Sequence, residues 1–238
     1  MNACIRNAGI TALVSCLLAG VPAHPAAAQA VAMALKDQFA MAALAAAQNR
    51  QALQAYTWIE TTQISVNGDV KNTKIESCRY GPDGQVQRSP LSQTSAPQPG
   101  GLRGMVAKSK AADMQTELGS AAALVHQYVP LDPARIQAVY AAGGVSLGQA
   151  GPGTGKIQFA NYVQQGDVLT LTLNTSARVL DQIDVATWLD TNSNQVTLDV
   201  DFDFLPDGTR YPITTTLLIP GSQIQVQIKN GTYQKLAQ

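Results

Sequence analysis

The chain is poor in charged residues, and the charges that it has are balanced and dispersed. Charged side chains form 13% of the sequence, with 16 Lys and Arg against 16 Asp and Glu, and no basic block occurs among the abundant Gln, Asn, Thr and Ser. Nucleic-acid binding and electrostatic attachment to a membrane both need clustered positive charge. The composition therefore supports neither of them.

Cysteine is nearly absent from the part of the chain that we expect to be the mature protein. Cys4 and Cys16 lie in the first 30 residues, so Cys78 has no partner for an intramolecular disulfide. On an extended segment, Cys78 would share one strand face with Glu76 and Tyr80. This pattern predicts a partly buried small side chain and not a catalytic thiol.

The first 30 residues have the organisation of a signal peptide. One positive charge precedes an apolar core at residues 10–21, which is too short to span a bilayer, and small residues end the segment at Ala28 and Ala30. Cleavage after Ala30, or after Ala28, predicts a periplasmic or secreted protein with no transmembrane helix in the mature chain. The alternative is a membrane-anchored lipoprotein, because residues 13–16 resemble a lipobox and Cys16 could be acylated.

Residues 31–238 predict a single α+β domain. Apolar residues recur at helical spacing over 31–56, and short β-prone segments follow, two of them joined by the hairpin signal Asn67-Gly68. Residues 89–104 are rich in Pro, Gly and Ser and predict a mobile loop or lid. Helices are expected within 105–142, the second of them capped by Asp132 and started by Pro133.

The C-terminal part of the sequence is almost continuously strand-like. Six segments separated by short turns predict neighbouring antiparallel strands: 156–163, 168–174, 178–189, 195–205, 209–219 and 223–229. In the fourth, Asp199, Asp201 and Asp203 line the face opposite to the apolar residues. Alternate residues on a strand are about 6.6 Å apart, so we expect a solvated acidic face and not a tight metal site.

Two further features look catalytic at first sight. The segment Ala150-Gly-Pro-Gly-Thr-Gly-Lys156-Ile157 approaches a phosphate-binding loop, but Ala150 replaces the first glycine, Ile157 replaces the hydroxyl residue, and a strand follows where a helix is needed. We interpret it as a flexible connection between helix and sheet. His126, at the end of a predicted helix, is interpreted as a capping or surface residue. The sequence therefore assigns no catalytic residue, metal or cofactor.

The order of elements resembles that of a known carrier superfamily. An N-terminal helix, a strand meander, internal helices and a final antiparallel set containing residues 196–208, Val-Thr-Leu-Asp-Val-Asp-Phe-Asp-Phe-Leu-Pro-Asp-Gly, are similar to the outer-membrane lipoprotein carrier (LolA/LolB-like) superfamily. The resemblance implies a curved antiparallel sheet or incomplete β-barrel, with helices packed across its concave side and space there for acyl chains. The helical insertion at 105–142 departs from that pattern.

The leading hypothesis is a non-enzymatic periplasmic binding or carrier protein for a lipid, lipoprotein or other apolar ligand. The candidate ligand-binding residues are the aromatic side chains Trp58, Trp188, Phe202 and Phe204, which could line a cavity, although such side chains also pack in cores. The alternative is an envelope protein that docks a protein partner through a sheet edge and has no small-molecule ligand. A hydrolase assembled from Asp, Ser and His126 across the fold is the third hypothesis.

Overall fold

The structure, a computed structural model, describes residues 48–95, 101–174, 176–177, 179–191 and 193–236. The side chains of 101–107 and 149–150 are not included in this description. The predicted signal peptide, Cys16 and most of the predicted helix over 31–56 lie outside the described residues. Residues 48–53 are helical and lead directly into the first strand.

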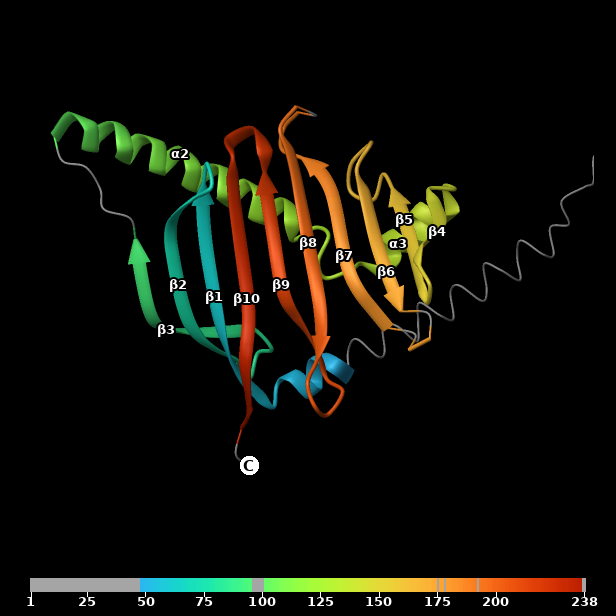
Figure 1. The fold of residues 1–238 in the computed structure, drawn as a ribbon. Helices are drawn as coiled ribbons and strands as arrows, with labels where there is room; N and C mark the ends of the chain where they lie inside the picture. Colours follow the sequence, from blue (N-terminus) through green and yellow to red (C-terminus); the bar gives the residue numbers. More distant parts are fainter. Residues whose placement is uncertain (1–47, 96–100, 175, 178, 192, 237–238) are drawn as a thin grey trace, which may run out of the picture. The chain divides into compact units, whose positions relative to one another are not determined.

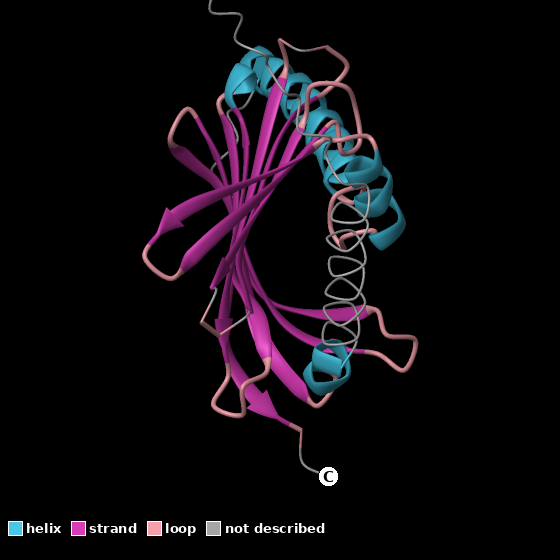
Figure 2. Cartoon of the chain, turned by 90° about the vertical axis from the view of Figure 1, so that its right-hand side faces the viewer, coloured by secondary structure: helices cyan, strands magenta, loops and turns pink. Residues whose placement is uncertain are grey.

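Ten antiparallel strands form one open sheet in the order β3-β2-β1-β10-β9-β8-β7-β6-β5-β4 (Figure 1). The strands are β1 (Tyr56–Val66), β2 (Asp69–Tyr80), β3 (Val86–Ser95), β4 (Val145–Gly151), β5 (Thr154–Ala160), β6 (Val168–Asn174), β7 (Val179–Trp188), β8 (Gln195–Phe204), β9 (Arg210–Ile219) and β10 (Ile224–Lys235). Strands β1 to β3 form one meander and strands β4 to β10 form a second, and in each of them neighbours in the sheet are consecutive in sequence. The pairing of β1 with β10 joins the two meanders. The predicted α+β class with a curved antiparallel sheet is confirmed (Figure 2).

The local signals in the sequence placed most of these strands correctly. β6 has the predicted bounds, β8 and β9 differ from theirs by one residue at one end, and β7 is one residue shorter at each end. The hairpin between β1 and β2 turns at Asn67 and Gly68, whose φ angles of 56° and 80° are those of a two-residue type I′ turn. The alternation of apolar and polar residues and the turn chemistry are therefore sufficient to locate these elements.

The predicted mobile loop at 89–104 is wrong in its extent, because β3 continues to Ser95 and α2 (Gly101–Val125) begins soon after. Pro90 cannot donate a hydrogen bond to a neighbouring strand, which is why the sequence argued against a strand here. However, β3 lies at the edge of the sheet, and its register with β2 shifts at Pro90. An edge strand with a bulge tolerates proline at such a position.

The glycine-rich segment before Lys156 is also more regular than the flexible connection that its composition predicts. β4 and β5 form an edge hairpin that turns at Pro152 and Gly153. Gly153 has a φ of 74°, in the left-handed region where a side chain is disfavoured. Glycine therefore serves the tight turn of a hairpin in this segment.

The helical segment at 105–142 is the crossover between the two edges of the sheet. The chain leaves the sheet at β3, one edge, and re-enters at β4, the other edge. Nine interstrand spacings of about 4.8 Å separate these edges by about 43 Å. The 25 residues of α2 span about 37 Å at 1.5 Å per residue, so this one helix covers most of the distance between the edges.

The second helix, α3 (Pro133–Ala141), begins as the sequence predicts. The N-cap Asp132 accepts a hydrogen bond at its Oδ1 from the backbone N–H of Ala134, at 2.9 Å, and Pro133 is the first helical residue. After the helix, Gly143 has a φ of 75°, which ends the helical path. None of the described helices combines the length and hydropathy needed to cross a bilayer.

The hydrophobic core lies between these helices and one face of the sheet. One cross-strand row of this face runs through Phe159, Leu169, Val185, Leu198, Leu217, Val226 and Ile64. Ala121 and Leu124 of α2 and Ile136 of α3 belong to the same buried cluster. Figure 2 shows α2 on one side of the curved sheet. Helices and sheet therefore share one core.

A buried polar network fixes the end of α2 to the sheet. Asp167, in the turn before β6, is 0% exposed, and its carboxylate accepts hydrogen bonds from the backbone amides of residues 162–164 at 2.6–2.8 Å. The hydroxyl of Tyr128, just beyond α2, donates to the Asp167 carboxylate at 2.6 Å and lies 2.8 Å from Oγ1 of Thr187 on β7. The network therefore joins three parts of the chain that are far apart in sequence.

Candidate functional site

The candidate site lies where β9 and β10 separate. Their pairing ends at Thr214 and Lys229, after which β10 continues alongside β1 and β9 continues alongside β8 (Figure 1). Across the gap, Nδ2 of Asn230 donates a hydrogen bond to the carbonyl of Pro212 at 2.9 Å. The sheet is therefore opened at this end, and side chains instead of backbone hydrogen bonds fill the space.

Aromatic side chains gather at this opening. Trp58 on β1 stacks on Tyr233 of β10, with ring centroids 5.7 Å apart and ring planes inclined by 14°. Tyr80 approaches Trp58 at 5.4 Å from β2, and Tyr211 approaches Tyr233 at 4.5 Å from β9. Four strands thus supply rings to one cluster, which is typical of a site that holds apolar groups.

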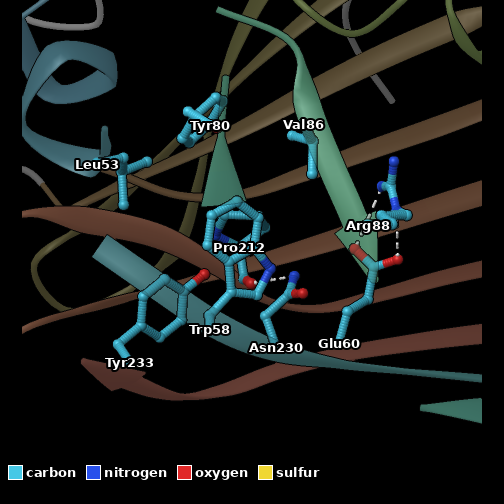
Figure 3. A pocket seen from close by; sticks show the side chains of 9 residues that line it. All are labelled: Leu53, Trp58, Glu60, Tyr80, Val86, Arg88, Pro212, Asn230 and Tyr233. Atoms are coloured by element: carbon cyan, nitrogen blue, oxygen red, sulfur yellow. Dashed lines mark hydrogen bonds and ion pairs between the residues drawn. The ribbon is translucent and has the colours of Figure 1, made fainter. Parts of the chain in front are cut away.

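The cluster borders a pocket of about 160 Å³ (Figure 3). Nine residues line it: Leu53, Trp58, Glu60, Tyr80, Val86, Arg88, Pro212, Asn230 and Tyr233. Its volume is close to that of a roughly 150 Å³ protein cavity that accepts a benzene molecule, and below the 300–1,000 Å³ typical of whole-ligand pockets. The pocket is therefore of a size to hold one ring or a short alkyl segment of a larger ligand.

Two ion pairs occupy the polar side of the site. Glu60 and Glu76 are directly opposed on β1 and β2, and both are buried. Arg88 on β3 donates from Nε and Nη2 to the two carboxylate oxygens of Glu60 at 3.0 and 3.3 Å, as Figure 3 shows, while Nζ of Lys74 lies 2.8 Å from Glu76. Each buried carboxylate thus has its own cation, and the polar wall has no net charge.

Asn230 presents a buried amide oxygen to the pocket. The amide oxygen Oδ1 of Asn230 is buried and accepts no hydrogen bond from any residue that the structure describes. A buried acceptor without a donor is unfavourable by about 1–3 kcal/mol. Because Asn230 lines the pocket, a ligand with an N–H or O–H group could supply the missing donor.

The site does not contain an activated nucleophile among its described residues. Cys78, on β2 opposite Trp58, is 1% exposed, and burial raises its pKa to about 11, which keeps the thiol protonated at neutral pH. Burial also raises the pKa of Tyr80 and of Tyr233, so both remain neutral phenols. His126 is exposed in the turn after α2.

The structure separates the four aromatic residues that the sequence suggested. Trp58 lines the pocket, and Phe202 and Phe204 on β8 flank the guanidinium group of Arg210, whose Cζ lies 5.5 and 4.7 Å from their ring centroids. Trp188 lies against Gly166. It points to the face of the sheet opposite to that of its neighbour Thr187, which is buried. Three of the four thus lie on or near the opened end of the sheet.

Four residues of the site were not expected from the sequence: Glu60, Arg88, Asn230 and Tyr233. For Glu60 a signal existed, because strand alternation places it on the same face as Trp58, and a carboxylate on a buried face is unusual. The other three have no comparable signal. Their positions depend on the pairing of β3 with β2 and of β10 with β1, which local patterns do not reveal.

The acidic row on β8 lies apart from the pocket. Asp199 opposes Asp184 of β7, and Asp201 and Asp203 follow it as exposed side chains. Within the described part of the chain, no three His, Cys, Asp or Glu side chains gather closely enough to hold a metal ion. Burial and the hydrogen bond and charge of Asp199 raise the pKa of Asp184 to about 6.

We expect the Asp199→Asn variant to be more stable than the original protein at pH 8, by about 1 kcal/mol. Because the pKa of Asp184 is raised by folding, its contribution to stability is present below about pH 4 and is lost as the pH rises through about 6. Asparagine removes the repulsion that develops there. Urea unfolding at pH 8 and pH 4 measures the difference, with Asp113→Asn on the exposed surface of α2 as the control. An equal effect of Asp199→Asn at the two pH values would contradict the expectation.

Comparison with known proteins adds no relative to this description. No family model matches the chain, and no curated protein and no solved structure matches it either.

Proposed function

We propose that this chain is an exported, non-enzymatic binding or carrier protein for an amphiphilic ligand, and that the apolar part of the ligand enters the pocket beside Trp58. The observation that carries the proposal is a pocket with aromatic walls on an opened sheet, edged by an Asn230 oxygen that accepts no hydrogen bond from a described residue. Burial of apolar surface would drive the binding, and the polar wall would orient the ligand.

The fold supports the same proposal. The core under α2 and α3 fills one end of the sheet face, since Ser222 in the turn between β9 and β10 contacts Glu117 of α2 at 2.5 Å. The pocket lies at the other end of β9 and β10, beside the helical residues 48–53. We infer that this face is the concave, ligand-bearing side of a lipid or lipoprotein carrier, as in the superfamily that the order of elements resembles.

The chain offers a clean test, because it contains two tryptophans and they lie in different places. In the Trp188→Phe protein, Trp58 is the only indole, and 1-octanol should change its emission in a saturable manner. In the Trp58→Phe protein, the emission of Trp188 should stay unchanged over the same range. Native mass spectrometry of the gently purified protein should also show a bound amphiphile. A Trp58 emission that never saturates, together with an empty protein, would rule the proposal out.

A second candidate function is the docking of a protein partner at a sheet edge. The observation in its favour is that Leu147 on edge strand β4 and Leu91 on edge strand β3 are 75% and 59% exposed. A protein that binds no amphiphile but retains a partner in a pull-down would favour this function.

Export is the part of the proposal that depends on residues outside the described structure. The sequence of residues 1–30 supports removal of a signal peptide, and a periplasmic location is consistent with a lipid or lipoprotein ligand. The intact mass of the purified mature protein distinguishes cleavage at Ala30 from acylation at Cys16.

A further inference from the structure

Arg210 is the most unusual charged residue near the pocket. Its side chain is 15% exposed, yet Nε, Nη1 and Nη2 are all buried and donate no hydrogen bond to any residue in the described part of the chain. The nearest carboxylate oxygen, Oδ1 of Asp181, is 3.6 Å from Nη2, which is too long for a hydrogen bond. Within the described ranges, none of the guanidinium donors is therefore used in a hydrogen bond.

The backbone of Arg210 is held firmly, although no described residue accepts a hydrogen bond from its guanidinium group. Oδ1 of Asn49 accepts a hydrogen bond from the backbone N–H of Arg210 at 2.6 Å, and Nδ2 of Asn49 donates to its carbonyl at 2.8 Å. The rings of Phe202 and Phe204 lie against the guanidinium group and fix its plane. The donors are thus presented in a defined direction, without the entropy cost of ordering a mobile side chain.

Arg210 lies on the same strand, and on the same face of the sheet, as the pocket residue Pro212. Pro212 lines the pocket and lies two residues farther along β9, about 7 Å away, and alternate residues of a strand face the same side. Phe202 pairs with Pro212 and Phe204 pairs with Arg210 across β8 and β9. An apolar strip thus leads from the pocket to the guanidinium group.

A buried guanidinium group without acceptors is strongly unfavourable, because water no longer solvates its five N–H donors. Asp181 offsets part of the charge through space but supplies no hydrogen bond. Planar oxyanions fit the fork of a guanidinium group with two parallel hydrogen bonds, and carboxylates are the commonest of these. A carboxylate would satisfy Arg210 in a way that a neutral or cationic group cannot.

We infer that Arg210 binds the carboxylate of an amphiphilic acid whose apolar chain occupies the pocket beside Trp58. This inference rests on the proposed function and names its ligand class, a carboxylic acid with an alkyl or aromatic body. The apolar chain would lie along Pro212 and Phe202, and the acid group would reach the guanidinium group between Phe202 and Phe204.

Octanoate and 1-octanol test the inference, because they share an alkyl chain and differ in the head group. In the Trp188→Phe protein, octanoate should bind at least tenfold more tightly than 1-octanol. Arg210→Gln should weaken octanoate binding at least tenfold and change 1-octanol binding less than twofold. Arg210→Lys should fall between, since lysine keeps the charge but not the fork. The control is Arg79→Gln, which removes the same charge from an exposed position on β2 and should change neither affinity.

The outcomes separate this inference from the proposed function. Equal binding of octanoate and 1-octanol, unaffected by Arg210→Gln, would overturn the role of Arg210 and leave the pocket standing. Binding of neither compound would overturn the proposed function and this inference together. If Arg210→Gln does not fold, the inference is tested by comparing the affinities of octanoate and methyl octanoate for the protein that retains Arg210. A methyl ester that binds as tightly as the acid would overturn the inference.

Discussion

Replacing Asp167 by alanine is expected to lower the free energy of unfolding by about 3–5 kcal/mol. The substitution removes the common acceptor of the buried Tyr162 amide, the Tyr128 hydroxyl and the half-buried amides of residues 163 and 164. Each such group costs about 1–3 kcal/mol, and relaxation of the turn recovers part of the sum. Urea unfolding followed by far-ultraviolet circular dichroism measures the change.

The control for this prediction is Asp83→Ala. Oδ1 of Asp83 also accepts a turn hydrogen bond, from the backbone N–H of Gln85 at 3.0 Å, but the side chain is exposed. Water can replace this acceptor, so we expect a cost below about 1 kcal/mol. Asp167→Asn, which keeps one acceptor oxygen, should give an intermediate value. Similar costs for Asp167→Ala and Asp83→Ala would show that the buried network does not hold α2 against the sheet.

Replacing Arg88 by methionine is expected to lower the free energy of unfolding by about 2–4 kcal/mol at pH 7. The side chain of Glu60 is 9% exposed and would lose both hydrogen bonds of its partner while facing the buried Glu76 across the strands. The loss is smaller than for a fully buried pair because the side chain of Arg88 is itself 45% exposed. Methionine keeps most of the apolar stem, so the change reports mainly the lost ion pair.

A double-mutant cycle identifies the cause. The Arg88→Met, Glu60→Gln double variant removes the unpaired charge, and we expect it to recover to within about 1 kcal/mol of the original protein. Lys71→Met is the matched control, since Lys71 and Asp69 form an ion pair whose side chains are 41% and 76% exposed. That change should cost less than about 1 kcal/mol. A double variant as unstable as Arg88→Met would mean that the packing of Arg88, and not its charge, supports β3.

The same variants connect stability with ligand binding. Arg88 and Glu60 line the pocket. A folded double variant therefore keeps the aromatic walls and replaces this ion pair by two uncharged side chains. The orientation that the polar wall imposes on a ligand can then be separated from the apolar contact with Trp58. This separation is not available from single variants, because each of them leaves one charge of the pair without its partner.

Much of the fold was predictable from short stretches of sequence. Val196, Leu198 and Val200 alternate with polar residues on β8, and the structure buries all three. Such alternation and turn chemistry act over two to four residues and need no knowledge of the partner strand. The prediction failed at Pro90, because the tolerance of a strand for proline depends on whether the strand lies at an edge.

The sequence by itself determined the β1–β2 hairpin, strands β6 to β9, the capped start of α3 and the placement of Cys78 on one strand face with Glu76. Only the tertiary structure decided that β1 pairs with β10, that β9 and β10 separate at Thr214, and that Arg88 reaches Glu60. The physical reason is the distance along the sequence over which each kind of interaction acts. Side-chain alternation follows from the geometry of a single strand. The pocket, and the guanidinium group of Arg210 with no hydrogen-bond acceptor among the described residues, arise from contacts between segments that lie far apart in sequence.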